Sequence, residues 1–323
     1  MRYAMIGILI KNLIKADKKL NEIPILIPEP KEISNTKNNN AYLLTSECTL
    51  CFINVNNSKI LLDDLNGFLG TISTIKLNQV DVDDSDVECL NHKNEGDLLD
   101  ANNEESYNLE IDNNQILIYS THVKGVFYGI QTLIQLIKNA YLTKVSSLDK
   151  ENLVLNKIYI RDVPDLKIRG VAQDISRGQV FTVENAKRYI EILSHYKMNT
   201  YGITYLGDIF AHPKYPEIGK DRGALTIEEI REIDEYAKSR NIDFIPFFQC
   251  LGHNDNVLMH NKYGHLGEFP GAHSFDISNP DVIPFLNDYI TEISKTFSSI
   301  NFHIACDESF DVGRYNSKDF IAQ

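Results

Sequence analysis

The stretch Ile300-Asn-Phe-His-Ile-Ala-Cys-Asp-Glu-Ser309 runs from apolar residues into two adjacent carboxylates. Ile300 to Ile304 predicts a short buried strand, and Asp307 and Glu308 follow its C-terminal end. This order suits a parallel α/β barrel, in which the active site lies at the C-terminal ends of the strands. A strand followed by a solvated helix start is the alternative, because acidic side chains favour the first turn of a helix. The sequence upstream decides between them.

Three similar units precede this stretch, and each predicts a strand followed by a helix. The strands are expected at 168–172, 200–205 and 242–248, and the helices begin at Thr182, Thr226 and Asn279. The buried stripe of the third helix is predicted as Ile283, Leu286, Ile290, Ile293 and Phe297. Four such units in series imply a parallel sheet with right-handed crossovers. In a barrel the residues that follow the strands converge on one mouth, and here they are Asp174, Asp208, His253 and the pair Asp307-Glu308.

The chain is expected to form two domains joined by a linker. Residues 22–145 predict an α+β domain, residues 146–165 the linker, and residues 166–323 the barrel domain. The elements expected in the first domain are strands at 43–55, 59–62, 107–111 and 115–119 and a helix at 125–137. An amphipathic helix that packs on the sheet completes a two-layer unit.

Residues 1–21 are interpreted as a leader helix. Their short apolar core, Ile6 to Ile10, follows a single Arg, but no small-residue cleavage site comes after it. An export signal is the alternative. The chain has five cysteines, an odd and scattered set that fits a reducing compartment, so a cytoplasmic location is expected.

The charge and the motifs argue against several classes of partner. The formal net charge of −13 argues against nucleic acid and anionic membranes, and no apolar run approaches the ~20 residues of a spanning helix. Cys48 and Cys51 lack a second ligand pair and are interpreted as free structural thiols. The acidic cluster 81–86 lacks the glycine of a calcium loop. No metal and no cofactor are predicted.

Several motifs carry a family resemblance when they are taken together. They are Arg169-Gly-Val-Ala-Gln-Asp-Ile-Ser-Arg177, Tyr196-Lys-Met-Asn-Thr200, Gln249-Cys-Leu-Gly-His253, His303-Ile-Ala-Cys-Asp-Glu308 and Gly125-Val-Phe-Tyr-Gly-Ile-Gln-Thr-Leu133. In this combination the chain resembles glycoside hydrolase family 20, the β-N-acetylhexosaminidases, in the style of the hexosaminidase D-like branch. The resemblance implies an accessory α+β domain followed by a (β/α)8 TIM barrel.

The chain departs from the family pattern in three respects. Ala305 stands where Gly is usual, and Gly207-Asp208 replaces an acidic pair. The stretch from Ile168 to Gln323 is also shorter than the ~250 residues of a whole barrel, so only strands one to four are expected. The chain has no Trp. This agrees with the loss of the second half, because relatives take the aromatic walls of the sugar pocket from that half.

The resemblance implies catalytic roles at the strand ends. Glu308 would protonate the leaving oxygen and later activate water, and Asp307 would hold the acetamido N–H of the sugar. His253 and Asp208 would form a relay to the acid. Neighbours on a strand point to opposite faces, so the two acids do not suit flanking a bond as acid and nucleophile. The substrate's own acetamido oxygen would attack instead and form an oxazolinium intermediate.

The substrate-binding residues that the resemblance implies are Arg169 and Asp174. Arg169 resembles the arginine that grips sugar hydroxyls, yet its early position in the strand also allows an ion pair with Asp162 or Asp165. For Asp174 a binding role and a scaffold role near the mouth are equally open.

Three functional hypotheses follow. The first is an exo-β-N-acetylhexosaminidase that removes terminal N-acetylglucosamine or N-acetylgalactosamine from glycans. The second is a non-catalytic half barrel that needs a companion chain or a copy of itself, because four strands would expose two edges and an apolar face. The third is a carbohydrate-binding module, which would not need the acid pair.

Overall fold

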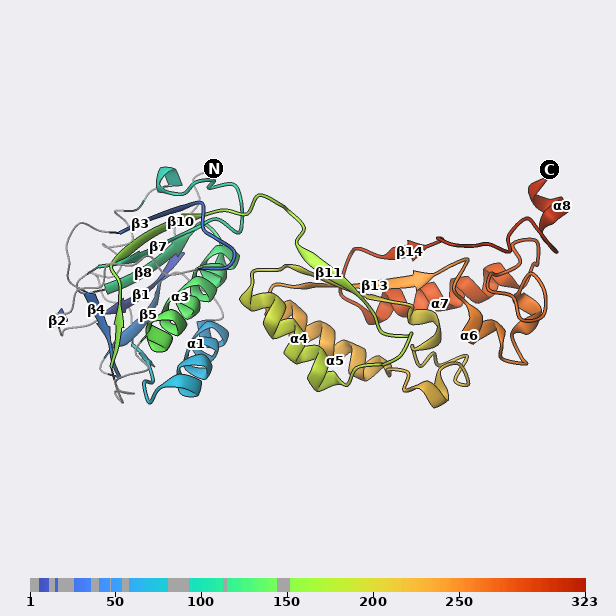
Figure 1. The fold of residues 1–323 in the computed structure, drawn as a ribbon, viewed down its shortest axis with the longest axis horizontal. Helices are drawn as coiled ribbons and strands as arrows, with labels where there is room; N and C mark the ends of the chain where they lie inside the picture. The colour runs from blue at the N-terminus through green and yellow to red at the C-terminus, as the bar shows by residue number, and fades with distance from the viewer. Residues whose placement is uncertain are drawn as a thin grey trace. The chain divides into compact units, whose positions relative to one another are not determined.

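The chain divides into two compact units, Met1–Lys167 and Ile168–Gln323 (Figure 1). A computed structural model describes residues 6–11, 15–16, 26–35, 41–46, 48–53, 58–80, 93, 95–112, 115–143 and 152–323. Each unit has its own buried apolar core. Of the helices within those ranges, none combines the length and the apolarity that crossing a bilayer requires.

The first unit is built on a seven-stranded sheet within the described residues. The strand order is β3 (Glu32–Asn35), β10 (Ile158–Asp162), β7 (Tyr107–Ile111), β8 (Gln115–Ser120), β1 (Ile6–Lys11), β5 (Thr49–Ile53) and β6 (Asn78–Gln79). Only β5 and β6 pair in parallel within this sheet. A smaller sheet joins β2 (Lys15–Ala16), β4 (Ala41–Leu44) and β9 (Leu153–Leu155).

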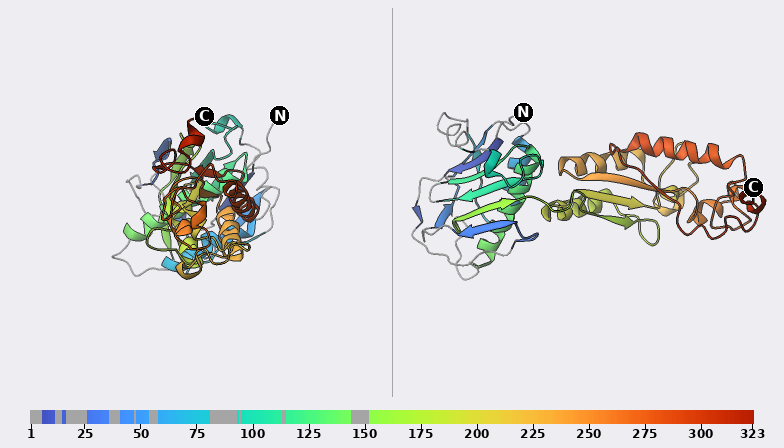
Figure 2. Two further views of the ribbon diagram at one scale, coloured as in Figure 1. Left: turned by 90° about the vertical axis from the view of Figure 1, so that its right-hand side faces the viewer. Right: turned by 90° about the horizontal axis from the view of Figure 1, so that it is seen from above.

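Two helices, α1 (Ser58–Ile72) and α3 (Val123–Thr143), pack against the larger sheet (Figures 1 and 2). The apolar stripe predicted for residues 125–137 is buried in this layer, with Val126 and Leu133 fully covered. The two-layer α+β arrangement is therefore confirmed. Cys48 and Cys51 are buried free thiols, as predicted. The acidic cluster 81–86 lies outside the described residues.

Two expectations about the ends of this unit are wrong. Ile6–Lys11 forms the strand β1, paired with β5 and β8, where a leader helix was expected. The alternating isoleucines of this segment are β-branched, which favours a strand. The strand β10 comes from the predicted linker, but it pairs with β3 and β7. Its residues alternate between buried and half-buried, which is the period of a strand.

The segment 59–62 is helical, where a strand was expected. It belongs to α1, in which Leu61, Leu65 and Leu69 recur every four residues and are each at most 4% exposed. A window of four residues is too short to distinguish this helical repeat from the alternation of a strand.

The second unit is a four-stranded parallel sheet whose strands follow chain order. They are β11 (Gly170–Asp174), β12 (Thr200–Thr204), β13 (Asp243–Gln249) and β14 (His303–Ala305). The helices between them are α4 (Val183–His195), α5 (Ile227–Ser239) and α7 (Val282–Thr296). Right-handed crossovers place all three on one face of the sheet, so the predicted alternation of strands and helices is confirmed. The buried strand expected at Ile300 to Ile304 is wrong, because β14 begins only at His303 and Ile304 is 60% exposed. The short elements are η2 (Leu206–Asp208), η3 (Lys220–Arg222), α6 (Asp255–Leu258), η4 (Gly264–Leu266) and α8 (Lys318–Ile321).

Helix starts are confirmed for α4 and α5 but not for α7. Thr182 caps α4, and Thr226 forms a capping box with Glu229 at the start of α5. The N-cap of α7 is Asp281, two residues later than expected. Its buried face is Val282, Phe285, Tyr289, Ile293 and Thr296, whereas Ile283 is 59% exposed. The helix carries apolar residues on two adjacent stripes, so periodicity alone did not fix which stripe packs inward.

Candidate active site

The loops after three neighbouring strands each contain a residue with a left-handed backbone. These residues are Tyr205 after β12 (φ 64°), His253 after β13 (φ 58°) and Glu308 after β14 (φ 47°). Such a backbone costs about 1–3 kcal/mol in a non-glycine residue and clusters at functional sites. The turns redirect the chain at the strand ends, where the sequence placed its candidate residues.

His253 and the two adjacent acids form the centre of the site. The Nε2 atom of His253 lies 3.4 Å from Oδ2 of Asp307 and 3.3 Å from Oε2 of Glu308. These are ion-pair distances, without the alignment of a hydrogen bond. The His253 side chain is only 9% exposed, whereas the carboxylates are 63% and 59% exposed. A shielded imidazole therefore faces two solvent-accessible acids.

The same three side chains are close enough to share a cation. Among the described residues, one ligand atom from each of His253, Asp307 and Glu308 lies within 4.8 Å of the other two. One imidazole and two carboxylates could thus bind either an ion or a mobile proton. Both uses require the two acids on the same side of the imidazole.

The loops after β13 and β14 pack closely against each other beside these residues. A Cβ added to Gly252 would lie 2.7 Å from the carbonyl oxygen of Asp307. Real Cβ atoms do not approach backbone oxygen that closely, so this contact requires glycine. Gly252 thereby lets the loop of His253 pack against the loop of the acids.

A second histidine, His273, binds the backbone of His253. Its backbone N–H donates to Nε2 of His273 at 3.0 Å, and Nδ1 of His273 lies 2.9 Å from Oδ2 of Asp255. The two imidazole rings meet edge to face, with centroids 4.7 Å apart. The ring of Tyr205 contacts His253 in the same geometry at 5.3 Å.

Asp208 is buried, but the expected relay to His253 is not seen. Its Oδ2 accepts hydrogen bonds from Ser176 Oγ (2.7 Å), Arg222 Nη1 (2.5 Å) and Asn256 Nδ2 (2.6 Å). His253 is not among its hydrogen-bond partners in the described residues. Burial raises the pKa of Asp208, although its three partners partly offset the rise. The side chain ties together the loops after β11, β12 and β13, which accounts for its burial.

Asp174 anchors the turn after β11. Its Oδ1 accepts from the backbone N–H groups of Ser176 (3.0 Å) and Arg177 (3.1 Å), and its Oδ2 accepts from Arg177 Nε at 2.6 Å. Burial alone would raise the pKa of Asp174, but the hydrogen bonds from Arg177 and Ser176 outweigh it and lower the pKa. The Arg177 guanidinium also lies 4.1 Å above the ring of Tyr205. This geometry gives Asp174 a scaffold role at the mouth.

Arg169 lies at the opposite end of β11 from the acids. Its Nε donates to the carbonyl oxygen of Lys197 at 3.0 Å, and its backbone N–H donates to Asn199 Oδ1 at 2.9 Å. The five residues of β11 put about 16 Å between the two strand ends. The sugar-binding role implied for Arg169 is therefore not supported by this placement, because its side chain engages the start of the strand.

A hollow of about 390 Å³ opens beside Asp307, whereas Glu308 and His253 are not among its described lining residues. Its lining includes Asp174, Arg177, Tyr205, Gln249, His303 and Asp307. His303 stacks on Phe247 with ring centroids 4.2 Å apart, which makes a flat aromatic surface. Gln249 is 4% exposed, and its Oε1 has no hydrogen-bond partner in the described residues. The hollow thus combines an aromatic surface with an unsatisfied amide and an acid.

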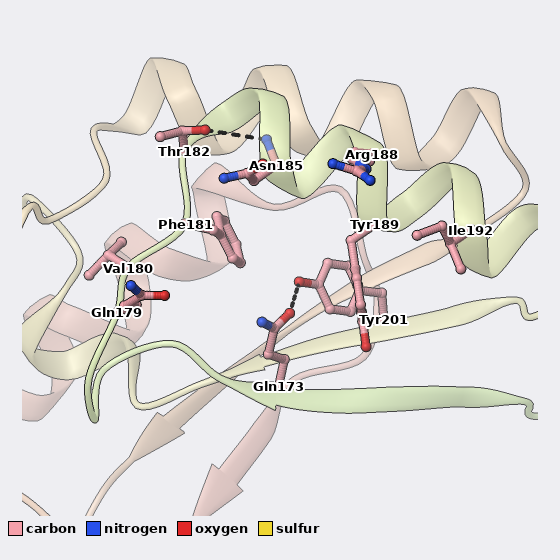
Figure 3. A pocket seen from close by; sticks show the side chains of 10 residues that line it. All are labelled: Gln173, Gln179, Val180, Phe181, Thr182, Asn185, Arg188, Tyr189, Ile192 and Tyr201. Atoms are coloured by element: carbon pink, nitrogen blue, oxygen red, sulfur yellow. Dashed lines mark hydrogen bonds between the residues drawn. The ribbon is translucent and has the colours of Figure 1, made fainter.

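A second cavity, of about 490 Å³, lies between α4 and β11 (Figure 3). Tyr201 donates a hydrogen bond to Gln173 at 2.5 Å, and the ring of Tyr189 lies 5.4 Å from that of Tyr201. Its ten described lining residues include no carboxylate and no histidine. The hollow beside Asp307 is therefore the candidate for acid–base chemistry.

Several residues of the site escaped the sequence analysis. Ser176 and Asp255 lie in the loops that follow the first and the third predicted strand, so that position alone could have drawn attention to them. Arg222 and His273 had no local signal, because each reaches the site from a loop 14 or 20 residues further along the chain.

Comparison with known proteins points to one family. Residues 23–163 match the family model described as glycosyl hydrolase family 20, domain 2, and residues 167–323 match the model of its catalytic domain. A β-hexosaminidase of Porphyromonas gingivalis is 29% identical over 233 residues, which cover 64% of this chain and 29% of that protein. One of Vibrio furnissii is 27% identical over 240 residues, covering 64% of this chain and 38% of that protein. The chain thus spans about a third of the length of these curated relatives.

The fold is similar to that of a solved structure, Streptomyces plicatus N-acetyl-β-hexosaminidase in complex with Thio-NAglucal. The TM-score is 0.73 at 21% sequence identity, covering 95% of this chain and 64% of that chain. The likeness confirms the predicted order of an α+β unit followed by strands of a TIM barrel. Because the two family models together match nearly the whole sequence, this chain belongs to glycoside hydrolase family 20 and carries its domain 2 followed by its catalytic domain.

Proposed function

We propose that this protein is a β-N-acetylhexosaminidase, acting on terminal β-linked N-acetylglucosamine or N-acetylgalactosamine. The observation that carries the proposal is the contact of one shielded imidazole, His253, with the two adjacent acids at 3.3 and 3.4 Å. Carboxylates at the C-terminal ends of barrel strands are the usual position of catalytic groups in this fold.

The arrangement of the acids favours a mechanism without a protein nucleophile. A nucleophile and an acid must lie on opposite faces of the sugar. Asp307 and Glu308 are instead consecutive residues that approach the same nitrogen of His253, so they are poorly placed to flank a sugar from opposite faces. The nucleophile therefore has to come from the substrate, and a 2-acetamido oxygen is suitably placed to attack the anomeric carbon.

Each acid then has a distinct task. Glu308 gives its proton to the glycosidic oxygen as the acetamido oxygen bonds to the anomeric carbon and the alcohol leaves. Asp307 accepts a hydrogen bond from the acetamido N–H and stabilises the positive charge of the oxazolinium. Water then attacks the anomeric carbon and displaces the acetamido oxygen, Glu308 takes up a proton of the water, and the configuration is retained. Contact with His253 orients both carboxylates, and we expect the contacts to tighten when substrate excludes water.

Turnover should depend both on the acetamido group of the substrate and on the carboxyl group of Glu308. We expect turnover of 4-nitrophenyl N-acetyl-β-glucosaminide but not of 4-nitrophenyl β-glucoside, because only the former carries the attacking acetamido group. Glu308→Gln should lower kcat for the first substrate by 10²–10⁴-fold, which is the usual contribution of a general acid. The assay is release of nitrophenolate.

The matched control is Asp319→Asn, which neutralises an exposed acid in the C-terminal segment. It should leave kcat unchanged. Equal rates on the two substrates would contradict the acetamido mechanism, and an unaffected Glu308→Gln variant would contradict the role of Glu308.

A companion chain or a second copy is part of the proposal. The catalytic carboxylates are more than half exposed, and Ile304, which lines the same hollow as Asp307, is 60% exposed. A water-excluded site would need further protein over this surface. If the chain alone gives no turnover, adding a polypeptide that carries the missing barrel strands should restore it.

A further inference from the structure

The loop after β13 and the loop after β14 are joined through His273. This histidine comes from a turn 20 residues beyond His253, and its side chain is 24% exposed. It contacts His253 on one side and residues that follow the acid pair on the other. Within the described residues His273 contacts neither carboxylate of the acid pair, so its influence on them would pass through His253.

Four contacts fix the position of His273. Its Nε2 accepts from the backbone N–H of His253 (3.0 Å), and its Nδ1 lies 2.9 Å from Oδ2 of Asp255. Its own backbone N–H donates to Oδ2 of Asp311 at 2.7 Å. The ring of Phe310 stacks on it, with centroids 6.1 Å apart and planes 28° apart. Both Phe310 and Asp311 closely follow Glu308, so His273 links the two loops directly.

The contacts determine where the proton of His273 lies. A ring nitrogen that accepts a hydrogen bond from a backbone N–H cannot carry a proton itself, so Nε2 of His273 is unprotonated. In the neutral ring Nδ1 then carries the proton and donates it to Asp255. The carboxylate of Asp255 therefore selects the tautomer that His253 needs.

His253 depends on this acceptor because its backbone is strained. At φ 58° it occupies the left-handed region, a conformation that persists only when its surroundings enforce it. The bond to His273 satisfies its backbone N–H in that conformation. Without it the backbone could relax, and the ring would turn away from the acids.

We propose that His273, with its tautomer set by Asp255, is a positioning residue that aims His253 at Asp307 and Glu308. The inference rests on the proposed function for its catalytic consequence, but its geometric part stands independently. The alternative is that His273 only pins the loop of residues 254–274 through Asp311. That alternative needs neither an unprotonated Nε2 nor any effect on His253.

The first test reads the tautomers without any substrate. In the ¹⁵N-labelled full chain near neutral pH, long-range ¹H–¹⁵N correlation spectra should show His273 with a protonated Nδ1 and an unprotonated Nε2. Replacement of His273 by Phe should shift the ring signals of His253. A protonated Nε2 on His273, or His253 signals unchanged in His273→Phe, would overturn the inference.

The second test is kinetic. His273→Phe keeps a ring but removes the acceptor, and we expect kcat to fall about 10–100-fold with KM within about threefold, because a misplacement of about 1 Å costs rates of this order. His273→Gln should recover much of the loss, since its amide oxygen can accept from His253. His265→Gln, at an exposed histidine of the same segment, is the matched control and should leave kcat unchanged.

The two levels of failure are distinguishable. If the wild-type chain turns over no N-acetylglucosaminide, either alone or with an added polypeptide that carries the later barrel strands, the proposed function has failed for this chain, and the spectra alone decide the inference about His273. If the wild type is active and His273→Phe retains its kcat while remaining folded by circular dichroism, the positioning role is refuted.

Discussion

At the scale of single residues, two aspartates near the mouth, the buried Asp208 and the exposed Asp174, have opposite electrostatic environments. Burial raises the pKa of Asp208, and its hydrogen bonds offset this rise only in part. Asp174 is less buried, so the hydrogen bonds from Arg177 and Ser176 outweigh the effect of burial and lower its pKa. The pKa of each carboxylate therefore depends less on the number of its hydrogen-bond donors than on how much water remains around it.

The lowered pKa of Asp174 predicts how stability depends on pH. The folded state holds this carboxylate in its charged form more strongly than the unfolded state, whose ordinary value is 3.8. Its contribution to stability is therefore complete above that value and is lost as the pH falls through the lower folded-state pKa. We expect the stability difference between wild type and Asp174→Asn to be largest above about pH 5 and to shrink toward pH 2.

Urea unfolding followed by circular dichroism at several pH values measures this difference. Arg177→Gln removes the main partner while leaving the carboxyl group in place, so it should reproduce part of the same trend. Parallel stability curves for wild type and Asp174→Asn would refute the assignment.

At the scale of elements, the contact between the loops after β13 and β14 depends on Gly252. We predict that Gly252→Ala forces these loops apart, because the new Cβ would lie 2.7 Å from the Asp307 carbonyl oxygen. Overpacking of this kind costs about 1–3 kcal/mol, and kcat should fall because His253 and the acids separate. Thermal unfolding and the nitrophenyl assay measure the two effects.

The control for this substitution is Gly67→Ala in α1. A Cβ at Gly67 meets nothing within 4 Å, so the same chemical change should stabilise the helix by about 0.5–1 kcal/mol. A Gly252→Ala variant as stable and active as wild type would show that the two loops yield more easily than the close approach implies.

The elements also show what sequence alone can and cannot predict. The four parallel strands and the caps at Thr182 and Thr226 were predictable, because strand patterns and capping residues act locally. The buried face of α7 was not, since Val282 and Ile283 are equally apolar and only tertiary packing selects between them. The strand β10 was overlooked because its partners, β3 and β7, are remote in sequence.

The same distinction holds within the candidate site. His253, Asp307 and Glu308 follow strands, so their meeting could be predicted from a parallel sheet. The pairing of Asp208 with Arg222 and Asn256 could not, because it depends on how three loops fold over one another. The partners of Asp208 are the reason that the expected relay to His253 is absent from the described contacts.

At the scale of the whole molecule, each unit buries its own core, yet the second unit leaves large apolar side chains in water. Ile300, Ile304, Phe310 and Phe320 are all more than half exposed. Within the part of the chain that the structure describes, β14 pairs with β13 alone, so its other edge has no strand partner there. Exposed edges and apolar side chains of this kind promote association.

We therefore predict that the chain self-associates as its concentration rises. Ile304→Lys should weaken association, because a charge on an edge strand disfavours pairing with another chain. Ile283→Lys is the matched control, since Ile283 is similarly exposed (59% against 60%) but lies on α7. Sedimentation velocity over a tenfold concentration range makes the comparison. A wild-type chain that stays monomeric throughout would contradict the prediction.

The link between the loops after β13 and β14 also has a genetic consequence. His253, Asp255, His273, the acid pair and Asp311 all lie in one uninterrupted segment, encoded by fewer than about 200 base pairs. A single recombination event could therefore transmit or delete the entire candidate site as one cassette.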